Sequence, residues 1–379
     1  MSRVYMDEVR MVSDAPTSDV QTSERLHPPA SGRLRQQLRA STGTCIALGL
    51  LKGRCDDLPT TAYLLLGERC SNACAFCAQS SQSCAEAGML SRVSWPVVDL
   101  SELLEGLRLA TSRPQSSGVT RQEGIGGLKL QRICIQATDR AETLLDLLTL
   151  VPLLKQAAGI PVSVSFRPHS LKDIVKLFDA GVDRLGIAID AADPEIYAQV
   201  KGGRFESAKA FLFSAASMYG GKISTHIIVG LGETEESAVR LIAECLGMGL
   251  TVGLFAFTPV KGTALESHRP PEIGHYRRVQ TALYLLKLGM VSVDGFCFRD
   301  GMICSIDVPE SRAIKALSSG EAFETSGCEF CNRPYYNERP GSVMYNYPRP
   351  LTKDEVVQAI ADTRLWSKEA VRHELLGSQ

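Results

Sequence analysis

The chain has 379 residues, of which 44% are hydrophobic and 22% are charged, the composition of an ordinary globular protein. Its formal net charge of −1 argues against a broad surface for nucleic acid. No apolar run approaches the roughly 18 residues that cross a bilayer, and the N-terminus lacks an apolar signal core. We therefore expect a cytoplasmic protein with no membrane contact.

In chain order, a polar segment rich in Ser, Asp and Pro is expected to form a mobile tail over residues 1–32. A helical extension at 34–51 then opens a domain that we expect to span residues 33–298. Strands and helices alternate through it, with a long loop at 113–127. The expected strands are 61–66, 130–137, 161–166, 184–189, 222–230, 251–257 and one within 290–298. The expected helices are 97–110, 141–157, 170–180, 204–218, 234–248 and 272–288.

This alternation predicts an α/β fold of parallel strands joined by right-handed crossovers. Because no glycine-rich dinucleotide fingerprint follows the first strand, a full or partial TIM-like (β/α) barrel is favoured over a doubly wound sheet. The periodicity weakens after about residue 298. Residues 299–379 are therefore expected to form a C-terminal cysteine-bearing extension with a terminal helix at 352–375.

Twelve cysteines are many for a cytoplasmic chain, in which clustered spacing indicates metal binding or catalysis. Cys70, Cys74 and Cys77 form a C-x3-C-x2-C loop directly after the first expected strand. Three thiolates can hold a 4Fe–4S cluster and leave one iron without a protein ligand. Zinc is the alternative, although zinc prefers four protein ligands in structural sites.

The spacing of these cysteines, with Phe76 before the third, resembles the signature of the radical S-adenosylmethionine (SAM) superfamily. The resemblance implies that SAM binds the open iron and is cleaved reductively to a 5′-deoxyadenosyl radical. Gly230 and Gly232 in IVGLGET resemble the segment that packs on the SAM adenine, and Asp190 resembles a residue near the ribose. A tight turn at the glycines and a helix cap at Asp190 are the alternative interpretations.

The stretch from Cys70 to about residue 265 resembles biotin synthase, through RICIQA around Cys134, IIVGLGET and FTPVKGTALE. In that family a second cluster inside the barrel is held by three strand cysteines and an arginine. Here only Cys134 matches, because Ser165 and Ser224 stand at the other two positions and no arginine corresponds. On this interpretation Cys134 is a small buried residue rather than a ligand.

A second cysteine group lies near the C-terminus, where Cys328 and Cys331 form a C-x2-C pair. With Cys304 as a third ligand, this group is expected to hold an auxiliary iron–sulfur cluster. Cys297 is a weaker candidate, and a zinc site remains the alternative. No catalytic residue beyond the cluster ligands is assigned.

The segments PTTAYLLLGERC and GCEFCNRPYYNERPGSVMYNYPRPLT resemble the biotin-synthase-related radical SAM proteins that act in pairs as an alternative lipoyl synthase. The resemblance covers most of residues 34–355. It implies insertion of sulfur into an octanoyl chain on a carrier protein or peptide. It also implies a paralogous radical SAM partner and an electron donor such as ferredoxin or flavodoxin.

Three hypotheses remain at this point: sulfur insertion, a radical SAM enzyme of cofactor biosynthesis without sulfur transfer, and a non-catalytic iron–sulfur or zinc scaffold. Several polar residues of the C-terminal extension are candidates for contact with a peptide substrate or with the cluster loop. They are Arg333, Arg339, Arg349, Tyr335, Tyr336 and Asn337.

Overall fold

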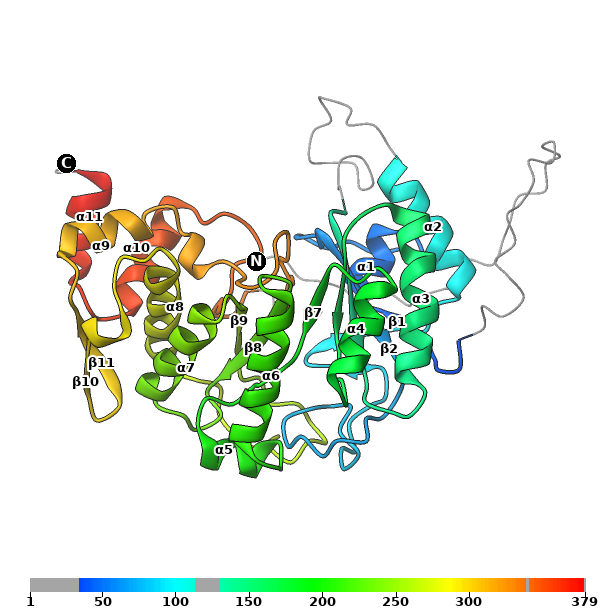
Figure 1. Cartoon of the computed structure of the whole chain (residues 1–379). Coiled ribbons are helices and arrows are strands. Elements are labelled where there is room, and N and C mark those ends of the chain that lie inside the picture. Colours follow the sequence, from blue (N-terminus) through cyan, green and yellow to red (C-terminus); the bar gives the residue numbers. More distant parts are fainter. Residues whose placement is uncertain (1–33, 113–129, 339–340, 378–379) are drawn as a thin grey trace.

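The computed structural model describes residues 34–112, 130–338 and 341–377, so the expected tail at 1–32 and loop at 113–127 lie outside the described residues. A seven-stranded sheet forms the centre of the molecule (Figure 1). β1 is antiparallel to β2, and every other neighbouring pair is parallel. In spatial order the strands are β1 (Leu38–Ala40), β2 (Thr61–Leu66), β5 (Arg132–Ala137), β6 (Val162–Ser165), β7 (Arg184–Gly186), β8 (Ile223–Val229) and β9 (Thr251–Ala256).

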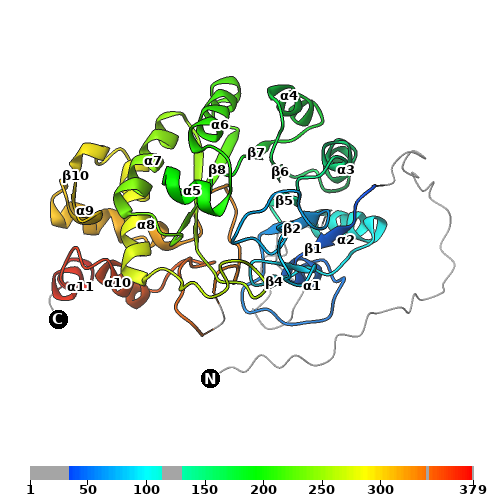
Figure 2. The same ribbon diagram turned by 90° about the horizontal axis from the view of Figure 1, so that it is seen from below.

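Helices cover the outer side of this curved sheet, as Figures 1 and 2 show. α1 (Thr42–Ala47) connects β1 to β2, and a small hairpin of β3 (Met89–Leu90) and β4 (Val93–Ser94) follows β2. The helices after the hairpin are α2 (Leu100–Ser112), α3 (Thr143–Ala158), α4 (Leu171–Asp179), α5 (Pro194–Val200), α6 (Phe205–Tyr219), α7 (Glu235–Gly247) and α8 (Ile273–Lys287). None of the helices in the described residues is both long and apolar enough to cross a bilayer.

Alternation along the strands separates an apolar outer face from a polar inner face. On β5, Ile133 and Ile135 join the main core, as Val162 and Val164 do on β6. The residues between them lie on the opposite face, because successive strand side chains alternate. These inner positions are Cys134, Gln136, Ser163, Ser165, Gly186, Ser224, His226 and Gly253. Small and polar residues do not fill a barrel as branched apolar ones do, so the inner face leaves room for a site.

The structure confirms six of the seven expected strands in the central sheet, and it corrects the seventh strand and two other expectations. The extension expected to be helical over 34–51 contains strand β1 and only a short helix, because Leu38–Ala40 pairs with β2. The strand expected within 290–298 is β10 (Phe296–Arg299), which pairs with β11 (Met302–Ile306) in a separate hairpin. The terminal helix expected at 352–375 is two helices, α10 (Lys353–Asp362) and α11 (Lys368–Leu376).

The C-terminal part gathers beyond α8 (Figure 1). It contains α9 (Glu310–Leu317), α10 and α11, with the short 3-10 turns η1 (Val293–Gly295) and η2 (Glu321–Phe323). Ile314, Phe323 and Ile360 form part of its own apolar core. This core anchors the residues that follow η2.

Residues 326–337, called the bridging segment here, cross from β9 to the start of β2. Both ends of the segment contact β9: Ser326 Oγ accepts the Leu254 amide at 2.8 Å, and Asn337 Nδ2 donates to the Ala256 carbonyl at 2.8 Å. Its middle contacts the start of β2, where the Thr60 and Thr61 hydroxyls donate to the carbonyl of Phe330 at 2.6 and 2.9 Å. The sheet is therefore a partial barrel whose edge strands do not pair with each other in the described residues, and the bridging segment spans its open side.

A buried charge network fixes the start of α7. The Glu235 carboxylate, fully buried, accepts hydrogen bonds from Arg278 Nη2 at 2.6 Å and from the Ile303 amide at 2.8 Å. His275 Nδ1 lies 3.1 Å from Glu235, and His275 Nε2 lies 3.6 Å from Glu233. Since Glu233 accepts the amides of the preceding turn, the network ties α7, α8 and β11 to that turn.

We expect Glu235→Gln to lower the free energy of unfolding by about 3 kcal/mol, because it leaves the Arg278 guanidinium buried without its counter-charge. Urea unfolding of the full chain measures the loss. The control is Glu236→Gln, which removes only an exposed pair with Arg240 and should change stability by less than about 0.5 kcal/mol. Equal effects of the two substitutions would contradict the assigned role of Glu235.

The same network predicts a pH dependence. Burial disfavours the charged imidazole, but Glu233 and Glu235 outweigh it and raise the pKa of His275 from 6.5 to about 9. A raised folded-state pKa stabilises the fold fully below the unfolded value, and that contribution is lost as the pH rises through the folded value. The urea concentration at the unfolding midpoint should therefore decrease as the pH rises from 6.5 to about 9. His275→Gln should reduce this decrease. The exposed control His373→Gln should leave the profile unchanged, and the prediction fails if both variants behave alike.

Candidate iron–sulfur and SAM site

The first cysteine group lies in the loop after β2, where Cys70, Cys74 and Cys77 are half-buried. Cys70 Sγ accepts hydrogen bonds from the Asp139 amide at 3.2 Å and from Asn72 Nδ2 at 3.3 Å. The loop is tied down by the Ala75 amide, which donates to the Val200 carbonyl at 2.7 Å. Such donors stabilise a thiolate, which is the form that binds iron.

Burial raises the pKa of Cys74 to about 11 and that of Cys77 to about 12. Iron must therefore displace protons from these thiols, so cluster binding is linked to pH. No three His, Cys, Asp or Glu side chains in the described ranges are already drawn together as a metal-binding group. Three thiols on one short, anchored loop nevertheless fit the three protein-held corners of a four-iron cluster. Phe76 is half-buried and packs against the main core.

Asp190 lies beyond β7 in a left-handed conformation, with φ of 62°, and pairs with Ile227 of β8. Its carboxylate is 2.6 Å from Lys201 Nζ, which also donates to the Ala188 carbonyl at 2.7 Å. His226 Nε2 lies 4.0 Å from the other carboxylate oxygen, and burial lowers the pKa of His226. Asp190 is therefore held by a buried lysine beside the cysteine loop, and its contact with the SAM ribose stays a prediction.

The glycines after β8 form a tight turn. The Glu233 carboxylate accepts the Gly230 and Leu231 amides at 2.6 and 2.9 Å. At Gly230, φ is 104° and an added Cβ would lie 2.7 Å from the Pro271 ring. Glycine is thus required there by close packing of the chain itself. Contact of Gly230 and Gly232 with the SAM adenine also stays a prediction.

A small inner cavity of about 70 Å³ lies against the polar inner face of the sheet. Cys134 reaches it from β5, and Cys328 and Cys331 reach it from the bridging segment. Ser165 and Ser224 line the same cavity. The pKa values of Cys331 and Cys134 are raised, and burial is the largest cause in both. The structure therefore brings Cys134 to the Cys328–Cys331 pair, from which it lies far apart in sequence.

Cys304 is not among the residues that line this cavity. It is exposed on β11, where its Sγ lies 3.2 Å from the Cys297 carbonyl oxygen. The hairpin β10–β11 holds both cysteines in a sheet of their own. The structure thus does not bring Cys304 to Cys328 and Cys331 and has Cys134 beside them instead, whereas cluster binding by any of these thiols stays a prediction.

Tyr336 connects the two cysteine sites. Its hydroxyl lies within electrostatic range of both Cys77 and Cys134, and its backbone carbonyl accepts the Ser91 hydroxyl at 2.8 Å. Tyr336 thus lines the inner cavity and also interacts electrostatically with a cysteine of the first loop.

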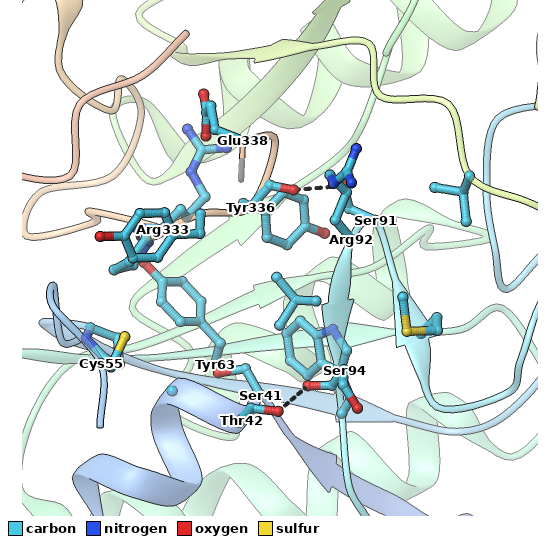
Figure 3. A pocket seen from close by; sticks show the side chains of 18 of the residues that line it. Ser41, Thr42, Cys55, Tyr63, Ser91, Arg92, Ser94, Arg333, Tyr336 and Glu338 are labelled. Carbon is cyan, nitrogen blue, oxygen red and sulfur yellow. Dashed lines mark hydrogen bonds between the residues drawn. The ribbon is translucent and has the colours of Figure 1, made fainter. Parts of the chain in front are cut away.

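A larger outer groove of about 1010 Å³ opens beside the inner cavity (Figure 3). Tyr63, Arg333 and Tyr336 line both spaces and face one another at their junction. Apolar residues, among them Ile46 and Val260, line the groove together with polar groups.

The other residues expected to contact a peptide substrate or the cluster loop do not lie together. Tyr335 lines the groove and donates to Asp57 at 2.8 Å, whereas Asn337 is bound to β9. Arg349 pairs with Glu355 at 2.8 Å, and Arg339 lies outside the described residues. Sequence reasoning missed Lys201, Tyr63 and the position of Cys134 in the inner cavity. The period-two alternation of polar residues in β5 and β6 is the signal that could have found the cavity.

Comparison with known families supports the assignment of the first cysteine loop. Residues 64–245 match the model of the radical SAM superfamily, a segment that begins in β2 and ends in α7. It contains the cysteine loop, Asp190 and the glycine turn.

Two curated relatives match part of this segment. One is the GTP 3′,8-cyclase of Limosilactobacillus fermentum, 27% identical over 125 residues, which are 32% of this chain and 37% of the relative. The other is a probable GTP 3′,8-cyclase of Methanococcus aeolicus, 31% identical over 93 residues, which are 24% of this chain and 31% of the relative. The chain thus spans about a third of the length of these relatives.

Solved structures with similar folds include methylornithine synthase, at 16% identity and a TM-score of 0.42, with 65% of each chain covered. The FeFe-hydrogenase maturase of Carboxydothermus hydrogenoformans matches at 16% identity and a TM-score of 0.45, over 83% of this chain and 76% of that one. The family match and the cysteine loop together show that residues 64–245 form a radical SAM superfamily domain.

Proposed function

We propose that this chain is a radical SAM enzyme that inserts sulfur into an unactivated carbon of an octanoyl chain carried by a protein or peptide. The observation that carries the proposal is the convergence of Cys134, Cys328 and Cys331 on one cavity beside the radical SAM loop. A reaction that moves sulfur needs a sulfur source near the radical, and this cavity is suited to an auxiliary iron–sulfur cluster.

When bound, SAM and its cluster supply a 5′-deoxyadenosyl radical that removes hydrogen from an unactivated carbon, and the auxiliary cluster supplies sulfur. Cys70, Cys74 and Cys77 would hold the first cluster. Lys201 and Asp190 would fix the polar groups around SAM. Tyr336 and Trp95, which line the inner cavity, would exclude water from the reacting carbon.

The outer groove supports a tethered substrate. It has a volume of about 1010 Å³ and shares Tyr63, Arg333 and Tyr336 with the inner cavity. A flexible acyl arm on a lysine can extend along such a groove while its carrier stays outside. On the same proposal, ferredoxin or flavodoxin supplies electrons. A paralogous radical SAM partner adds sulfur to a second carbon of the octanoyl chain.

A second candidate is a radical SAM enzyme of cofactor biosynthesis that transfers no sulfur. The names of the two curated relatives favour it, because both are GTP 3′,8-cyclases. Arg54 and Lys261 on the outer groove are cations that a triphosphate would require. On this candidate the inner cavity would hold a cluster that binds substrate rather than one that is consumed.

We expect Cys134→Ser and Cys328→Ser each to reduce the iron content after anaerobic reconstitution from about eight to about four irons per chain, if both clusters have four irons. Cleavage of SAM to 5′-deoxyadenosine with dithionite should persist, because the first cysteine loop is untouched. Iron analysis and mass spectrometry measure the two quantities.

Cys304→Ser is the matched control. Because Cys304 is exposed on β11, this variant should keep its full iron content. Loss of the second cluster in Cys304→Ser, together with full retention in Cys134→Ser, would show that the inner cavity is not the auxiliary site.

The products separate the two candidates. Reconstituted protein with SAM, reductant and an octanoyl-lysyl peptide should yield a peptide with sulfur added, alone or with the partner present. Incubation with GTP should leave GTP unchanged. Turnover of GTP with no thiolated peptide would reject sulfur insertion and support the second candidate.

A further inference from the structure

The bridging segment carries a buried cation, Arg333, that forms no ion pair with a carboxylate of the described residues. Arg333 Nη2 donates to the carbonyls of Ser326 and Leu254 at 2.7 and 3.4 Å. Its guanidinium carbon lies 3.7 Å from the centre of the Phe255 ring. Its Nε is buried and has no hydrogen-bond partner. No Asp or Glu is among the described residues that line the inner cavity. The buried Glu338 carboxylate interacts electrostatically with Arg333, but it accepts the Tyr345 and Asn346 amides and forms no ion pair with the guanidinium in the described residues.

An uncompensated buried charge costs several kcal/mol in folding. Two carbonyl groups and the face of one aromatic ring offset part of this cost. Glu338 supplies an opposite charge without an ion pair, because its carboxylate is engaged by two backbone amides. An anion in the inner cavity would compensate the charge of Arg333 more closely.

The thiols of the same cavity can supply that anion. Iron–sulfur clusters are held by deprotonated cysteines, so each bound thiol brings a negative charge to the metal centre. Cys134, Cys328 and Cys331 lie in the cavity that Arg333 lines. The charge that would pair with the guanidinium is of the sign that a thiolate-held cluster would bring.

The backbone links Arg333 to one of these thiols. The Arg333 amide donates to the Tyr63 hydroxyl at 2.8 Å, and that hydroxyl lies 3.4 Å from Cys331 Sγ. Phe330, Arg333 and Tyr335 all have positive φ, between 35° and 64°. Each such conformation costs free energy in a residue other than glycine, so surrounding contacts must maintain the turn that points Arg333 and Cys331 inward.

We propose that Arg333 is the counter-ion of the auxiliary iron–sulfur cluster, a positioning residue that retains the cluster and raises its reduction potential. This inference rests on the proposed auxiliary site but not on the identity of the substrate. The guanidinium stabilises the electron-rich reduced cluster more than the oxidised one, because reduction adds negative charge beside a fixed positive charge.

The test uses the full-length chain after anaerobic reconstitution. Arg333→Met should release the auxiliary iron to a chelator about ten- to a hundred-fold faster than the unaltered chain, as expected for loss of an outer-shell partner. The midpoint potential of the remaining auxiliary cluster, followed by electron paramagnetic resonance, should become more negative. Arg333→Lys keeps the charge and should restore most of the retention and of the potential.

Two controls keep the outcomes distinct. Arg349→Met removes a surface arginine that pairs with Glu355 and should change neither quantity. The four irons of the first loop report folding of every variant; if Arg333→Met loses them too, Arg333→Lys alone decides the test. An unchanged potential and release rate in Arg333→Met, or a lysine variant no better than methionine, would overturn the counter-ion role. An unaltered chain that binds only about four irons would instead reject the auxiliary site of the proposed function.

Discussion

Hydrogen bonds between the bridging segment and the starts of β2 and β5 close the inner cavity: the Thr60 and Thr61 hydroxyls donate to the Phe330 carbonyl, and Arg132 Nε donates to the Glu329 carbonyl. These bonds place the segment across the side of the sheet that lies open between β9 and β2. Cys328, Cys331 and Arg333 reach the inner face from this segment. The second sulfur site is therefore a property of long-range contacts between the two ends of the chain, whereas the first is a property of one loop.

The residues of the inner face are small enough for the bridging segment to pack close to the sheet. An added Cβ at Gly253 of β9 would lie 3.5 Å from the Ser326 carbonyl oxygen and 3.6 Å from the Gly327 Cα, so only a small residue leaves space here. Ser163 and Ser165 on β6 likewise leave the inner face open. A barrel interior normally gains stability from layers of branched apolar side chains. This sheet instead buries its apolar residues on the outer face, and the small and polar residues of its inner face leave a cavity.

The sequence was sufficient for features that depend on short-range pattern. Six strands and the cysteine loop follow from periodicity and spacing, because the three thiols of the loop lie within eight residues of each other. Features that depend on tertiary pairing were not predicted. Leu38–Ala40 forms a strand since β2 offers it a partner, and local propensity does not reveal that. Cys304 is nearer to Cys328 in sequence than Cys134 is, yet the β10–β11 hairpin turns it away.

The charges of the inner cavity explain why metal binding and the bridging segment would be coupled. Burial raises the pKa of Cys134 and Cys331, so without metal these thiols keep their protons while Arg333 stays charged. Iron would replace those protons and give the guanidinium an opposite charge, which turns an unfavourable buried cation into a favourable pair. Since residues 326–337 contain no helix or strand, they gain little from regular hydrogen bonding. The free energy of metal binding would therefore stabilise the segment that builds its own site.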